Sequence, residues 1–375
     1  MTNRSLDEAL CLLLERIDGT ATEDSEGFPH FADPATGRWT RSTAGDWTGG
    51  FWVGQLWLAA AATHRPRYAD LARRWAQRLQ ARTKSRTVFR GFLFWYGAAL
   101  GHLLLDDRVA RTVAVDGARS LATSFHPAAN VLPLDVDAEE AESVGASEAN
   151  IDGVPGGAPL LLWAAEELGE PRLRQIGLAH TRAHLKACVR ADDSVVQSFS
   201  FDPATGRVLR TYTHKGITDD STWARAQAWA MLGFAQASRA DAGAHAAALR
   251  VCDWWIDHLP ADEVARWDFD APLTPSTRVD SSATAIAAAA LLKVDPADPE
   301  RSQRYRSCAE RMVARLINHH LTPVGGRDSR PRGILADGCY NHRIGLATSN
   351  ELIWGDYFLL EALLALTGRI PNHAL

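Results

Sequence analysis

The amino-acid sequence predicts an all-α fold, built as a two-layer toroid of helices with minor β-hairpins. Two observations favour this fold. Six segments are nearly uncharged and rich in small residues, which is typical of helices that are buried on most faces. Amphipathic segments with apolar residues at i, i+3, i+4 and i+7 alternate with them. Because no Gly/Ser-rich linker interrupts this alternation, we expect one domain over residues 1–375.

The uncharged segments form a loose repeat. In a toroid they would line the central axis, and the loops before them would converge at one end of the ring. The segments begin at Gly49, Gly91, Gly153, Trp223, Ser281 and Gly355.

The amphipathic segments predict an outer layer of helices with one solvent-exposed face. Ser5, Pro171 and the pair Asp298-Pro299 mark helix starts among them. These segments span 5–17, 67–83, 170–189, 242–259 and 301–321.

Two short stretches predict β-hairpins. Residues 195–214 alternate apolar and polar side chains around an Asp-Pro-Ala-Thr-Gly turn. The same five residues recur at 33–37 and indicate a second hairpin. The acidic stretch 131–150 is interpreted as a loop before an inner helix.

Composition and charge exclude several classes of protein. The net charge is −5, with 40 Lys and Arg against 45 Asp and Glu, so the chain carries no positive field for nucleic acid. No apolar run reaches the roughly 18 residues of a membrane helix. The apolar stretch near the N-terminus is too short for a signal peptide. The 5 scattered cysteines contain no CxxC pair, so they indicate reduced thiols in the cytoplasm and no zinc site.

Tryptophan is unusually frequent, with 13 Trp against 6 Tyr and 3 Met. Many of these residues lie beside Gly and Ala. Flat rings next to small residues can line a sugar-binding cleft, and ordinary core packing is the alternative.

The polar residues at the heads of the inner segments are the candidates for chemistry. Asp152 precedes Gly-Val-Pro-Gly-Gly among apolar neighbours, where an unpaired carboxyl has a raised pKa that suits a proton donor. Arg225 and Trp229 share one face of a buried segment that follows Trp223. A buried Arg needs either an anionic ligand or a protein carboxylate. His214 is either a hydrogen-bond donor in the site or a surface residue.

Most other acids at these positions have a simpler interpretation as helix N-caps, and the same role is the alternative for Asp152. They are Asp46, Asp219, Asp220, Asp280 and Asp356.

Several motifs together resemble a known family, the unsaturated glucuronyl hydrolases (glycoside hydrolase family 88). The most specific is THKGITDDSTWARAQAWAMLGF at 213–234. Four other motifs match in order and spacing, so the resemblance spans nearly the whole chain. They are WTGGFWVGQLWL at 47–58, NIDGVPGGAPLLLWA at 150–164, DSSATAIAAAALL at 280–292 and GDYFLLEALL at 355–364.

The resemblance implies an (α/α)6 six-hairpin barrel and a definite reaction. Family members act on sugars that carry a terminal 4,5-unsaturated uronic acid. An acid protonates C4, water adds at C5, and the resulting hemiketal opens to release the partner sugar. The expected ligand is therefore a small acidic saccharide, and the mechanism needs no metal and no organic cofactor.

The family's residue roles carry over to specific positions. Asp152 matches the general acid and base, and His214 matches a histidine of the binding loop. Arg225 and the rings of Trp47, Trp223 and Trp229 match residues that hold the uronate and stack on the sugar.

The chain also departs from the family pattern. Before the second inner helix the family has a His-Asp-x-Gly-Phe run, where this chain has Val88-Phe89-Arg90-Gly91-Phe92, so Phe89 replaces the family's second carboxylate. Lys215 stands where Gln is common, and Gln197 stands where His is common. Residues 131–150 contain no Trp, although the family has one there.

These departures leave three interpretations open. The cations Lys215 and Arg90 lower the pKa of Asp152 and weaken it as a proton donor. Alternatively, they recognise extra negative charge on the substrate, or Asp219 or Asp220 replaces the lost acid. We expect Asp152, His214 and Lys215 in catalysis. We expect substrate contacts from Trp47, Phe89, Arg90, Gln197, Trp223, Arg225 and Trp229.

Three functions follow from these expectations. The first is hydration of an unsaturated uronyl or related enol-ether sugar. The second is a different reaction on an acidic sugar-like metabolite, namely elimination, isomerisation or ordinary glycoside cleavage. The third is non-catalytic sugar binding.

Overall fold

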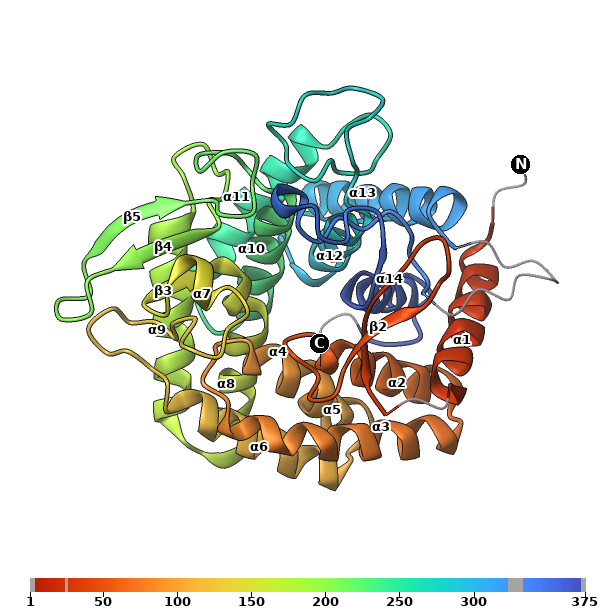
Figure 1. Ribbon diagram of the computed structural model, residues 1–375, viewed down its shortest axis with the longest axis horizontal. Helices are drawn as coiled ribbons and strands as arrows, with labels where there is room; N and C mark the ends of the chain where they lie inside the picture. Colours follow the sequence, from red (N-terminus) through yellow and green to blue (C-terminus); the bar gives the residue numbers. More distant parts are fainter. Residues whose placement is uncertain (1–3, 24–25, 323–332, 372–375) are drawn as a thin grey trace.

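The computed structural model describes residues 4–23, 26–322 and 333–371. Its helices form a closed ring of two layers, which Figure 1 shows along the ring axis. Each inner helix packs against the next, and the last packs against the first. The inner layer consists of α2 (Gly49–Thr63), α4 (Arg90–Phe94) with η2 (Trp95–Ala99) and α5 (Leu100–Leu105), α8 (Val154–Leu168), α10 (Ala224–Ala237), α12 (Ser281–Lys293) and α14 (Ile353–Leu366).

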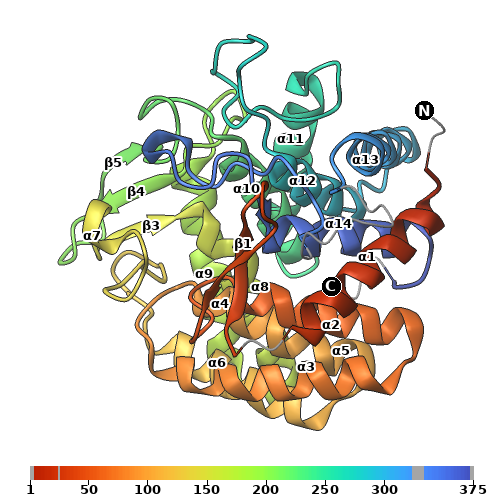
Figure 2. The ribbon, with the colours of Figure 1, turned by 45° about the vertical axis from the view of Figure 1, so that its right-hand side comes forward.

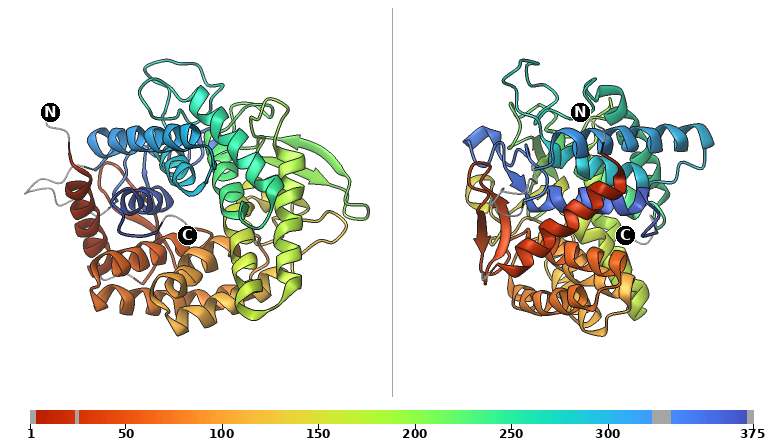
Figure 3. Two further views of the ribbon diagram at one scale, coloured as in Figure 1. Left: turned by 180° about the vertical axis from the view of Figure 1, so that it is seen from behind. Right: turned by 90° about the vertical axis from the view of Figure 1, so that its right-hand side faces the viewer.

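The outer helices surround the inner ring, and the view from behind in Figure 3 shows them around its periphery. Each one packs against the inner helix that precedes it in the chain, except α1, which packs against α14. The sixth helical hairpin is therefore assembled from both ends of the described chain. The outer helices are α1 (Leu6–Thr22), α3 (Pro66–Leu79), α6 (Arg108–Ala122), α9 (Pro171–Cys188), α11 (Ala242–His258) and α13 (Pro299–His319).

The six inner segments expected from the sequence are all confirmed, and so is the all-α class. The small residues allow the inner helices to pack closely. A Cβ on Gly50 would lie 2.3 Å from the carbonyl oxygen of Phe92, and one on Gly91 would lie 2.4 Å from the backbone nitrogen of Gly157. The outer helix α6 was not predicted from the sequence.

Among the described residues, two small antiparallel sheets lie on one side of the helical ring (Figures 1 and 2). Both expected hairpins are confirmed. In one sheet, β1 (Phe28–Ala32) pairs with β2 (Trp39–Ser42) and with β6 (Glu351–Leu352). In the other, β4 (Ser198–Phe201) pairs with β3 (Glu148–Asn150) and with β5 (Val208–Tyr212).

The interpretation of 131–150 as a plain loop is corrected, because this stretch holds the short helix α7 (Ala141–Val144) and strand β3. The remaining short helices are η1 (Gln80–Lys84), η3 (Ile151–Gly153) and η4 (His342–Ile344).

The N-cap interpretation holds for Asp280, whose side chain accepts hydrogen bonds from the backbone of Ser282 and Ala283. It is wrong for Asp46, Asp219, Asp220 and Asp356. The caps of α2, α10 and α14 are Thr48, Trp223 and Leu352, and none of them makes a side-chain capping bond. Asp356 lies inside the first turn of α14 and accepts from the backbone nitrogens of Ile334 and Leu335 instead.

Over the described residues, none of the helices is long and apolar enough to span a bilayer.

Candidate active site

A small cavity lies where the inner helices meet the β3–β4–β5 sheet. Its volume is about 10 Å³, which is room for about one water molecule. Aromatic rings form most of its wall, and four ionisable side chains face it. The lining residues are Trp47, Phe89, Phe92, Glu140, Asp152, Lys215, Trp223, Arg225 and Trp229.

Asp152 is positioned by the pairing of β3 with β4. The backbone nitrogen of Ile151 donates to the carbonyl oxygen of Gln197 at 2.9 Å, and the Gln197 side chain donates to Oδ2 of Asp152 at 3.2 Å. The other oxygen, Oδ1, is buried and has no hydrogen-bond partner in the described structure. Burial raises the pKa of Asp152 to about 6, although the charge of Lys215 opposes this shift. Both the protonated and the ionised form of this carboxyl group are therefore populated near neutral pH.

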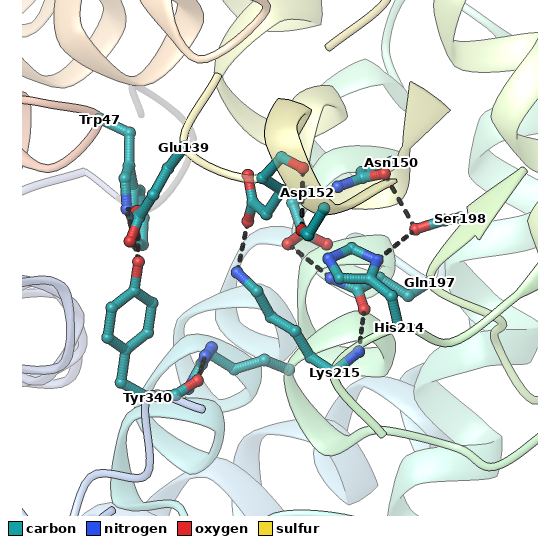
Figure 4. Close-up of polar contacts among 12 residues, drawn as sticks. Trp47, Glu139, Asn150, Asp152, Gln197, Ser198, His214, Lys215 and Tyr340 are labelled. Atoms are coloured by element: carbon teal, nitrogen blue, oxygen red, sulfur yellow. Dashed lines mark hydrogen bonds and ion pairs between the residues drawn. The ribbon is translucent and has the colours of Figure 1, made fainter. Parts of the chain in front are cut away.

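The residues around Asp152 form a hydrogen-bonded group, shown in Figure 4. Oε1 of Gln197 accepts from the backbone nitrogen of Lys215 at 3.1 Å. The Ser198 hydroxyl donates to Asn150 at 2.9 Å and lies 2.9 Å from Nδ1 of His214. Because a hydroxyl has one proton, Nδ1 of His214 is then the donor to Ser198.

His214 is neutral at physiological pH, because burial and the neighbouring charge of Lys215 lower its pKa to about 3. Its Nε2 atom is buried without a partner among the described residues. His214 is half-buried and belongs to the hydrogen-bonded group beside Asp152, but it does not line the cavity itself.

Lys215 and Glu140 form a buried ion pair at the cavity. Burial alone would raise the pKa of Glu140, but the charge of Lys215 and its hydrogen bond to Glu140 outweigh burial and lower that pKa. Sequence reasoning missed Glu140, since it lies in the 131–150 stretch that was taken as a plain loop. The adjacent acids Glu139 and Glu140, ahead of the Asp152 motif, were the only signal.

Asp219 and Asp220, which the sequence offered as replacements for the missing carboxylate, do not line the cavity. Both side chains are exposed, and Asp219 pairs with Arg343 at 3.1 Å. Glu140 is the second carboxylate that lines this cavity, and it comes from the segment 131–150.

Arg225 lines the cavity, but its charge is already matched by the protein. One Nη atom donates to Oδ2 of Asp280 at 2.8 Å, and both Nη atoms donate to the carbonyl oxygens of Cys339 and Tyr340. Its guanidinium lies 4.4 Å from the centre of the Trp223 ring. The sequence left two partners open for this buried Arg, an anionic ligand or a protein carboxylate. The structure shows the protein carboxylate, which is Asp280.

The prediction that Arg90 contacts the substrate is corrected, because its side chain does not reach the Asp152 cavity. It is the first residue of α4 and extends outward, where it donates to the hydroxyls of Ser120 in α6 and of Ser124 just after α6, each at 2.6 Å. It lines a separate cavity of about 490 Å³. Arg90 therefore does not act on the pKa of Asp152.

The aromatic wall contains the predicted rings. Phe89 and Phe92 stack at an angle of 6°, so an apolar surface occupies the position of the family's second carboxylate. Nε1 of Trp47 donates to Glu139 at 2.9 Å and to the Tyr340 hydroxyl at 3.1 Å. Two further rings complete the wall: Trp223, which directly precedes α10, and Trp229, which lies within it.

Comparison with known proteins identifies close relatives along almost the whole chain. No protein-family model matches it. The unsaturated glucuronyl hydrolase of Bacillus sp. (strain GL1) is 36% identical over 356 residues, which cover 92% of this chain and 92% of that protein. The unsaturated chondroitin disaccharide hydrolase of Streptococcus pneumoniae is 28% identical over 332 residues, covering 85% and 81%. The crystal structure of the Bacillus sp. GL1 hydrolase superposes with a TM-score of 0.89 at 33% identity, over 96% of this chain and 97% of that one.

Proposed function

The chain belongs to the unsaturated glucuronyl hydrolase family, and from this premise we propose that Asp152 protonates the 4,5 double bond of an unsaturated uronyl sugar. The ligand is a small acidic saccharide, and unsaturated glycosaminoglycan disaccharides are the first class to test, because one relative is named for a chondroitin disaccharide. The cytoplasmic location stays a prediction from the five cysteines, which are all free.

One observation carries the role of Asp152. Its carboxyl group is buried, its pKa is raised to about 6, and Oδ1 has no partner in the described structure. A general acid needs a proton available near neutral pH and a free oxygen that can reach the substrate. Among the ionisable groups that line the cavity, Asp152 alone meets both conditions. Arg225 and Asp280 hold one another, and Glu140 and Lys215 form a pair.

The reaction balances with the groups present. Asp152 gives its proton to C4, and the C4–C5 double bond supplies the electron pair for the new C4–H bond. A water oxygen bonds to C5, and its proton returns to Asp152. The resulting hemiketal breaks its C5–ring-oxygen bond, after which the hemiacetal at C1 releases the partner sugar. Net, one water is consumed.

Other residues position these reactants. Gln197 donates to Oδ2 of Asp152 and so holds the carboxyl group with Oδ1 toward the cavity. His214 has a free Nε2 that can accept a hydrogen bond from the attacking water or a sugar hydroxyl. The rings of Trp47, Trp223 and Trp229 offer stacking surfaces for the sugar.

The test is a panel of unsaturated uronyl disaccharides, sulfated and unsulfated, followed by the ultraviolet band of the conjugated double bond. We expect the band to disappear with at least one member of the panel. A band that persists with every member contradicts the proposal. A band that grows when saturated uronyl sugars are supplied instead would show the elimination reaction.

The pH dependence of kcat/KM gives a second prediction. Asp152 must be protonated to act as the acid, and its pKa is raised to about 6. We therefore expect kcat/KM to fall by about tenfold for each pH unit above that value, because the protonated fraction falls in that way. Steady-state rates between pH 5 and 8 measure this fall of kcat/KM. Enzyme that has been held at each pH and returned to pH 6 should recover its full rate, which checks that it stays folded. A flat profile would show that the proton comes from another group.

A further inference from the structure

The cavity as it stands cannot hold the proposed substrate. Its volume of about 10 Å³ accepts about one water molecule, whereas a sugar ring has many more heavy atoms. One of its lining carboxylates, Glu140, comes from the segment 131–150 rather than from the helical ring. Some part of the lining has to move when a sugar enters.

The contacts of that segment show where it is attached. Glu140 pairs with Lys215, and Glu139 accepts from Trp47 and from the Tyr340 hydroxyl. Figure 4 shows Glu139 meeting Trp47 and Tyr340 on one side of the site, with Lys215 between Tyr340 and Asp152. Two adjacent carboxylates therefore tie this segment to three different parts of the site.

The charges in the cavity single out Lys215. Arg225 is paired with Asp280, which also caps α12, and neither side chain is more than 1% exposed. The partner of Lys215 instead belongs to the segment 131–150. The proposed substrate brings its own carboxylate into this cavity, where a further anion beside Glu140 and Asp152 is unfavourable without a cation. Lys215 is the cation that such an exchange can free.

We propose that Lys215 binds the uronate carboxylate of the substrate, and that the Glu140 carboxylate occupies this position on Lys215 while the site is empty. Substrate enters by exchange: its carboxylate takes Lys215, and Glu140 leaves the cavity together with α7, while β3 stays paired with β4 and keeps Asp152 in place. The inference rests on the proposed function and names the group that selects for an acidic sugar. The second interpretation of the sequence, in which a cation recognises negative charge on the substrate, thus applies to Lys215.

Binding can be tested without turnover in the Asp152→Asn background, with the fluorescence of the Trp residues that line the site as the signal. The two probes are an unsaturated uronyl disaccharide and its methyl ester, which differ by one negative charge. We expect the acid to bind at least about tenfold more tightly than the ester, as a charged hydrogen bond contributes.

Two substitutions assign this difference to the pair. Glu140→Gln removes the competing charge, so the acid should bind severalfold more tightly while the ester changes little. Lys215→Met should abolish the preference for the acid over the ester. Because that variant leaves Glu140 buried without a cation, the double variant Glu140→Gln/Lys215→Met repeats the measurement with both charges removed.

Glu142→Gln is the matched control, because it removes one charge from an exposed position of the same segment. It should leave both affinities unchanged. The inference is overturned if the double variant still prefers the acid, or if Glu140→Gln weakens turnover about 100-fold without changing affinity, as expected of a catalytic carboxylate. The proposed function fails separately, when the wild-type protein removes no ultraviolet band.

Discussion

Replacing Asp152 with Asn should lower kcat by about 1,000-fold, because a positioned general acid contributes roughly that factor. The amide keeps the size of the side chain and removes the proton that C4 receives. Substrate affinity should stay within a few-fold, since the cavity wall and Lys215 are unchanged. Decay of the ultraviolet band measures kcat, and Trp fluorescence measures binding.

The control for this variant is Asp220→Asn. Asp220 lies in the neighbouring loop and its side chain is exposed, so kcat should change by less than about twofold. If Asp152→Asn keeps more than about a tenth of the wild-type kcat, the proton donor is a different group. Loss of both binding and near-ultraviolet circular dichroism would instead report a folding defect.

The second large effect concerns the stability of the ring. Asp280→Asn should lower the free energy of unfolding by about 3–5 kcal/mol, because it leaves the buried charge of Arg225 without its anionic partner. Asn retains an oxygen that can accept the capping bonds from Ser282 and Ala283. The loss therefore reports the ion pair rather than the cap. Urea denaturation of wild type and variant measures the difference.

An exposed ion pair supplies the comparison. Asp219 and Arg343 are 3.1 Å apart, similar to the 2.8 Å of Arg225 and Asp280, but their side chains are 55% and 42% exposed. Asp219→Asn should cost less than about 1 kcal/mol. Equal costs at the two positions would mean that the carbonyl oxygens of Cys339 and Tyr340 satisfy Arg225 without Asp280.

The fold was predictable because it depends on a pattern that repeats. Segments of small, uncharged residues predicted every inner helix, since such helices are stable only when buried on most faces. The missed outer helix α6 starts at a recognisable cap, Asp107, which accepts from the backbone of Ala110. This helix was not predicted because Gly117 interrupts the helical pattern of its sequence. In the structure that Gly faces Phe94, at a distance where a Cβ would overlap the ring.

A site residue was predictable only where a single sequence motif contains both that residue and the neighbours that surround it in the structure. Asp152 lies in such a motif, and so do Trp223 and Arg225. Glu140 could not be found in that way, because the fold of the 131–150 segment brings it to Lys215 from 75 positions away. The direction of a side chain is equally non-local. Arg90 adjoins Phe89 in sequence, yet it extends to α6 while Phe89 faces the cavity.

The sixth hairpin, which joins α1 to α14, has a consequence for how the protein is made. The side chain of Gln55 in α2 reaches the carbonyl oxygen of Ile353, a contact that spans 298 positions. During synthesis, the inner surface of α2 emerges from the ribosome long before α14 exists to cover it. Closing the ring is therefore a late event with a high contact order. Until then, the nascent chain exposes an apolar edge that chaperones would recognise.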